Sequence, residues 1–155
     1  MHAFWNDLER RIGTSLYGRR MYETMAVWDT AEMIEGKSAI VREYAEVWRD
    51  ADKVVFSRTL DQVTTERTRL EREFDPDAIR RLKEDAERDL SIGGPTLAAE
   101  AIRAGLVDEY QLVVAPVTVG GGTSVFPAGV RVDLELVDER RFTNGSVHLH
   151  YRTRS

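Results

Sequence analysis

The chain has 155 residues, a formal net charge of −5, 42% hydrophobic and 32% charged residues, and no cysteine. This length suits one domain with one core, and the balanced composition argues against disorder and against a membrane span. The lack of cysteine excludes disulfides and thiolate zinc sites, the acidic charge argues against nucleic acid as a partner, and the opening residues show no secretory signal, so we expect a cytoplasmic protein.

The first elements are two helices with a strand between them. Apolar residues recur at helical spacing over 2–11 and predict an amphipathic helix that Gly13 ends. A short buried strand is expected at 14–17, and the turn 18–20 follows it directly. Apolar residues over 21–28 predict a second, short helix on the sheet.

The clearest strand of the first half follows a capped helix. Residues 29–37 have loop chemistry, and Ser38 can cap a helix that runs to about residue 50. Residues 53–57 are β-branched and aromatic, which is typical of a strand. The strand ends in the polar turn 57–59.

A strand and helix pattern then repeats. Residues 68–73 alternate weakly and predict a strand, and Asp75 with Pro76 opens a helix that runs to about residue 88. A short strand at 89–92 leads through two glycines into a helix at 95–104.

The end of the chain shows strands alone. They are predicted at 110–117, 132–141 and 146–154, and Asn144-Gly145 is a strong hairpin signal between the last two. The pattern predicts an α/β fold with a mixed central sheet flanked by helices and a C-terminal antiparallel hairpin.

Three turns carry the chemistry, and each follows a predicted strand: Gly18-Arg19-Arg20, Ser57-Arg58-Thr59 and Gly93-Gly94-Pro95-Thr96. Ligands of open α/β sheets lie outside the carboxyl ends of strands, so the three turns are expected to converge on one ligand. Two glycines between a strand and a helix let the backbone approach an anion, and the helix start attracts its charge. A plain tight turn is about as common at such a place.

Arg19 and Arg58 also have two interpretations. With the hydroxyls of Ser57 and Thr59 they can bind a 2′-phosphate and so select NADPH over NADH. An exposed arginine beside acidic residues is more often a solvated surface charge.

His148 has only His150 near it on its strand, so no metal site is expected there.

A family resemblance covers nearly the whole chain. Residues 93–110, followed by Pro116 and the glycines 120–122, resemble the C-terminal reductase domain of bifunctional riboflavin biosynthesis enzymes and the stand-alone dihydrofolate-reductase-like proteins of bacteria. Residues 16–23 and 54–60 are similar to the family's other cofactor loops. The motifs are specific in this combination and order, and weak one by one.

The resemblance implies an NADPH-dependent reductase of the 5-amino-6-(5-phosphoribosylamino)uracil reductase type, which transfers hydride to a small pterin- or pyrimidine-like substrate. It places Gly93, Gly94 and Thr96 at the pyrophosphate, and Arg19, Ser57 and Arg58 near the adenosine phosphate. The full set of implied cofactor-binding residues is Gly18, Arg19, Ser57, Arg58, Thr59, Gly93, Gly94, Pro95, Thr96 and Leu97. A homodimer is expected by analogy.

The chain departs from the family at its start. Members usually begin with a strand and a Ser-Leu-Asp-Gly-like loop that closes over the nicotinamide, and no such segment precedes Met1. We therefore expect a single, N-terminally shortened domain over residues 1–155 and assign no catalytic residue. A relative that binds nucleotides or oligomerises without catalysis is an alternative, as is a binding protein for another phosphorylated ligand.

Overall fold

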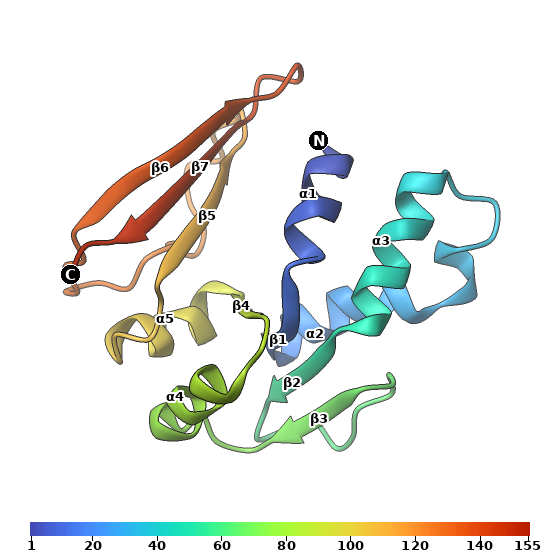
Figure 1. Ribbon diagram of the computed structural model, residues 1–155, viewed down its shortest axis with the longest axis horizontal. Coiled ribbons are helices and arrows are strands. Elements are labelled where there is room, and N and C mark those ends of the chain that lie inside the picture. Colours follow the sequence, from blue (N-terminus) through green and yellow to red (C-terminus); the bar gives the residue numbers. More distant parts are fainter. The chain divides into compact units, whose positions relative to one another are not determined.

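The helices and strands follow the predicted order closely (Figure 1). The structure is a computed structural model that describes the backbone of residues 1–155 and the side chains of 1–30 and 32–155. The helical elements are α1 (His2–Glu9), α2 (Arg19–Met25), η1 (Ala26–Asp29), η2 (Ala31–Met33), α3 (Ala39–Asp50), α4 (Pro76–Asp85) and α5 (Pro95–Arg103). The strands are β1 (Ile12–Gly18), β2 (Asp52–Phe56), β3 (Thr68–Glu71), β4 (Asp89–Gly93), β5 (Glu109–Val114), β6 (Leu134–Arg141) and β7 (Val147–Thr153).

The strands form two sheets, and the chain forms two compact units, residues 1–98 and 99–155. The first sheet has the order β3-β2-β1-β4, and its neighbouring strands are all parallel. The second has the order β5-β7-β6 and is antiparallel. This confirms the α/β class with its antiparallel C-terminal part, while the strands expected in one mixed sheet lie in a parallel sheet and an antiparallel sheet.

The core of the first unit joins the parallel sheet to its helices. The buried side chains of Tyr17 in β1 and Val55 in β2 pack with Tyr22 of α2 and Trp48 of α3. The indole Nε1 of Trp48 donates a hydrogen bond of 3.0 Å to the hydroxyl oxygen of Tyr17. These contacts hold β1 and β2 in place, and both strands lead into candidate turns.

A buried lysine closes the end of α3. The side chain of Lys53 is 2% exposed, and its Nζ donates to the carbonyl oxygens of Trp48 at 3.0 Å, Arg49 at 3.3 Å and Ala51 at 2.8 Å. Burial lowers the pKa of Lys53 to about 8. The ammonium thus satisfies carbonyl groups that a helix end leaves without partners.

The structure corrects two predictions in the first unit. Gly13 lies inside β1 rather than ending the first helix, and a Cβ built on it would lie only 2.9 Å from the Cβ of Arg88, so glycine serves a close approach there. Arg19 and Arg20 lie in the first turn of α2 rather than in a loop, because the helix begins directly after Gly18.

The second unit ends in the predicted hairpin. The amide of Ser146 donates to the side-chain oxygen of Asn144 at 3.0 Å, and Gly145 adopts a φ of +87°. β5 ends at Val114 rather than at 117, since Pro116 has no amide hydrogen to continue a ladder.

None of the helices in the described part of the chain has the length and apolar character that a bilayer crossing requires.

Candidate functional site

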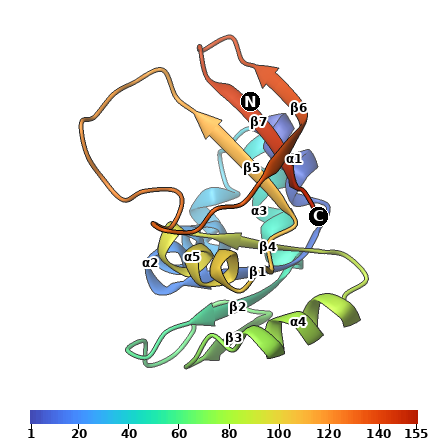
Figure 2. The same ribbon diagram turned by 90° about the vertical axis from the view of Figure 1, so that its left-hand side faces the viewer.

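The three candidate turns leave the same edge of the parallel sheet. Figure 2 shows β4, β1, β2 and β3 running side by side in this order. Gly18 at the end of β1 is in register with Phe56 of β2, and Tyr17 is in register with Gly93 of β4. Neighbouring strands lie about 4.8 Å apart, so the three strand ends fall within about 10 Å. The turns after β2, β1 and β4 therefore form one continuous edge, which we call the turn edge.

The turn between β4 and α5 requires glycine at one of its two positions. Gly94 has a φ of +90°, a backbone conformation that residues with a side chain rarely adopt, whereas Gly93 has no positive φ. α5 begins at Pro95, and its first intrahelical bond runs from the amide of Ala98 to the carbonyl oxygen of Gly94. The amides of Thr96 and Leu97 have no acceptor within the helix, so they are available to an anion.

The turn after β2 is shaped by a serine hydroxyl. Ser57 Oγ accepts hydrogen bonds from the amides of Thr59 at 3.2 Å and Leu60 at 3.0 Å. Ser57 is 9% exposed, while Arg58 and Thr59 face solvent. The acceptor capacity of Ser57 therefore goes into the turn itself, and its hydroxyl also lies 3.4 Å from Thr59 Oγ1, so the hydroxyl mainly shapes the turn.

Two arginines stand on the turn edge with carboxylate partners. Arg19 donates from Nη1 to Thr59 Oγ1 at 3.0 Å and from Nε to Glu23 at 2.9 Å, so it bridges the turns after β1 and β2. Arg58 pairs with Glu73 at 2.9 Å, and its side chain is 74% exposed. Exposed pairs of this kind contribute between about 0 and 1 kcal/mol, so a phosphate can displace the carboxylates at little cost.

Sequence reasoning missed three residues that shape the turn edge. Met21 of α2 packs against the glycine turn, 3.6 Å from the position of a Cβ on Gly93. Arg72 donates hydrogen bonds to two backbone carbonyls of the turn after β2, and Glu73 holds Arg58. No sequence signal marked the last two, because the predicted strand over 68–73 extended across them. The structure ends β3 at Glu71 and so places both residues directly after the strand.

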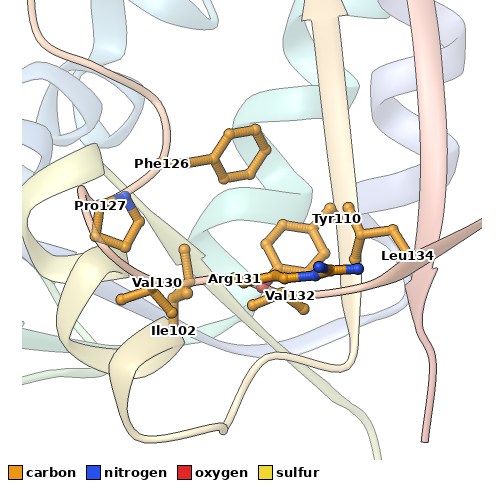
Figure 3. A pocket seen from close by; sticks show the side chains of 8 residues that line it. All are labelled: Ile102, Tyr110, Phe126, Pro127, Val130, Arg131, Val132 and Leu134. Carbon is orange, nitrogen blue, oxygen red and sulfur yellow. The ribbon is translucent and has the colours of Figure 1, made fainter.

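A separate hollow lies in the second unit (Figure 3). It has a volume of about 380 Å³, and Tyr110 and Phe126 face each other edge to face with ring centres 5.8 Å apart. Its lining is otherwise aliphatic, except for Arg131, which pairs with Asp133 at 3.0 Å. The lining residues are Ile102, Tyr110, Phe126, Pro127, Val130, Arg131, Val132 and Leu134. This hollow suits an apolar group and lacks the converging donors of the turn edge.

The two histidines of β7 have partners in β5. His148 Nε2 lies 2.6 Å from the side-chain oxygen of Gln111, and His150 Nε2 lies 2.9 Å from a carboxylate oxygen of Glu109. Burial, followed by the charge of His150, lowers the pKa of His148. Over the described residues, no three or more metal-binding side chains cluster in a way that could hold an ion.

Comparisons with known proteins give a family and a fold. The family model described as the RibD C-terminal domain matches residues 1–148. The chain is 28% identical over 149 residues to YyaP of Bacillus subtilis, described as an uncharacterized protein, and the match covers 95% of this chain and 77% of that protein.

Solved structures with a similar fold have lower sequence identity. A putative riboflavin biosynthesis protein from Shewanella sp. PV-4 superposes with a TM-score of 0.72 at 16% identity, over 96% of this chain and 78% of that one. A pyrimidine reductase-like protein from Corynebacterium diphtheriae gives 0.68 at 13% identity, over 99% and 80%. RibD of Acinetobacter baumannii gives 0.69 at 14% identity, and this chain spans 51% of its length.

Proposed function

The chain belongs to the RibD C-terminal domain family, and from that premise we propose that it is an NADPH-dependent reductase that transfers hydride to a pterin- or pyrimidine-like substrate. The names of its structural neighbours, a riboflavin biosynthesis protein and a pyrimidine reductase-like protein, point to the same class of reaction. The observation that carries the proposal is the turn edge, where anion-binding groups from three neighbouring parallel strands stand together.

The residues of the turn edge suit the two phosphate-bearing parts of NADPH. Gly94 and the amides of Thr96 and Leu97 offer a cradle for the pyrophosphate. Arg19, after the neighbouring strand β1, and Arg58, after β2 one strand further on, offer guanidinium forks for the 2′-phosphate of the adenosine. Thr59 is exposed beside them and offers its hydroxyl to the same phosphate. The proposed cofactor set is completed by four residues that shape the turns: Gly18, Ser57, Gly93 and Pro95.

The protein's share of the reaction is positioning. The bound nicotinamide supplies the hydride, and the side chains and amides of the turn edge fix the dinucleotide so that its reactive ring meets the substrate. The donors are attached to strands of one sheet, so their spacing is set by the backbone ladder rather than by flexible loops. We assign no proton donor.

A calorimetric titration with NADPH and NADH tests the proposal. We expect NADPH to bind more tightly, because only NADPH carries the 2′-phosphate. Arg58→Glu should weaken NADPH more than NADH. Equal affinities for the two cofactors, or equal losses in the variant, would contradict the roles of Arg19 and Arg58.

A relative that binds the nucleotide without turnover is the second candidate. It keeps the turn edge, and it predicts that NADPH binds there without being oxidised. Measuring NADPH oxidation with ribosylaminopyrimidine and dihydropterin substrates separates the two candidates. Binding without oxidation of NADPH supports the second, and steady turnover supports the first.

We further propose that residues 1–155 act as one domain in a cytoplasmic homodimer. Exposed apolar side chains on β5 and β6 support the pairing, with Val114 56% and Leu136 49% exposed. Light scattering gives the oligomeric state, and a single thermal transition is expected if the chain unfolds as one domain.

A further inference from the structure

The segment that follows β3 reaches back to the turn after β2. The two strands are parallel neighbours, with Phe56 in register with Glu71, and the amide of Ser57 donates to the carbonyl oxygen of Glu71 at 3.0 Å. Arg72 is therefore the first residue beyond the ladder, directly beside the start of the turn. Its position is set by the sheet.

Arg72 ties the two ends of the turn together. Its Nη1 donates to the carbonyl oxygen of Ser57 at 3.0 Å and to that of Leu60 at 2.5 Å. The hydroxyl of Ser57 meanwhile accepts from the amides of Thr59 and Leu60. The carbonyls at both ends of the turn and the amides at its far side are thus fixed, and Arg58 and Thr59 project toward solvent.

We propose that Arg72 is a positioning residue that gives the turn edge its selectivity for a 2′-phosphate, an inference that rests on the proposed function. A backbone carbonyl oxygen repels a phosphate. The guanidinium of Arg72 holds the carbonyl oxygens of Ser57 and Leu60 in place by hydrogen bonds. The turn is then ordered before the cofactor arrives, so binding does not have to order it. Arg72 acts through Arg58 and Thr59.

A purely structural role makes a different prediction. If Arg72 only satisfied surface carbonyls, its loss would lower stability and weaken both cofactors alike. If it positions the phosphate-binding side chains, its loss changes the ratio of the NADPH and NADH affinities. That ratio is the deciding quantity.

The test compares three variants with the wild type by calorimetric titration. In Arg72→Met, which keeps the aliphatic stem, we expect NADPH to bind about tenfold more weakly and NADH to change by less than about twofold. Arg69→Met is the matched control, since Arg69 lies on β3 with a 60% exposed side chain, contacts Glu71, and undergoes the same change of charge. It should leave both affinities within about twofold of the wild type. Arg72→Lys keeps the charge but lacks the planar fork, and should recover only part of the NADPH affinity.

Amide hydrogen exchange gives a readout that needs no cofactor. The amides of Thr59 and Leu60 should exchange faster in Arg72→Met and at the wild-type rate in Arg69→Met. Equal losses of NADPH affinity in these two variants, full recovery by Arg72→Lys, or an unchanged affinity ratio in Arg72→Met overturns the role of Arg72 alone. A wild type that binds neither dinucleotide overturns the proposed function itself.

Discussion

Replacing each of the twin glycines by alanine separates backbone strain from space. A Cβ on Gly93 would lie 3.6 Å from Met21, and a Cβ on Gly94 would lie 3.7 Å from the same side chain, so both positions have room for a methyl group. Only Gly94 has a positive φ, at +90°. Gly93→Ala and Gly94→Ala are therefore a matched pair that differ in backbone conformation.

The expected difference follows from two contributions to the free energy of unfolding. A side chain forced into a rare backbone conformation costs about 1–3 kcal/mol. Replacing glycine by alanine also restricts the unfolded chain, which stabilises the folded state by about 0.4–1 kcal/mol in both variants. The second contribution cancels in the comparison, so Gly94→Ala should be less stable than Gly93→Ala by about 2 kcal/mol, or by about 6 °C in Tm for a chain of this size.

Thermal unfolding followed by calorimetry measures the difference in stability. The same strain moves the start of α5, so Gly94→Ala should also bind NADPH at least about tenfold more weakly, while Gly93→Ala should lose clearly less affinity. Equal stability of the two variants would refute the argument that the turn needs a positive φ. Equal affinities with unequal stabilities would refute the link between the turn and the pyrophosphate.

Three further predictions concern buried or shaping polar groups. Burial holds the pKa of Lys53 at about 8, below its value of 10.5 in the unfolded chain. Between these two pH values the unfolded state binds more protons than the folded state, so the free energy of unfolding, measured in urea, should rise with pH by up to about 3 kcal/mol. Lys53→Met should remove this rise. Trp48→Phe loses the hydrogen bond to Tyr17 and part of a buried ring, so urea denaturation should show a loss of about 2–4 kcal/mol. Tyr17→Phe loses the hydrogen bond alone and should lose only about 1 kcal/mol; equal losses would mean that ring volume contributes nothing. Ser57→Ala removes the acceptor for two amides of its turn and should weaken NADPH more than NADH in a calorimetric titration, with unchanged affinities as the contrary result.

The sequence alone determined most of the helices and strands of this protein. Ser38 and Asp75 mark the starts of α3 and α4, and in the structure their side chains accept hydrogen bonds from amides of the first helical turn. The hairpin at Asn144-Gly145 and the turn at the twin glycines were predicted for the same reason. Each depends on the conformation of a few neighbouring residues, and local chemistry specifies it.

The tertiary structure decided how these elements meet. Gly13 was predicted to end a helix because its local setting resembles a helix end, but the close approach of Arg88 explains it. Arg72 and Glu73 had no recognisable motif, and they matter because β3 lies beside β2 in parallel. The order of strands in a sheet depends on which apolar faces are buried together across many residues of chain, and no local pattern records it. The sequence therefore predicted the three turns and their convergence, and only the packing of the sheet supplied the residues that support them there.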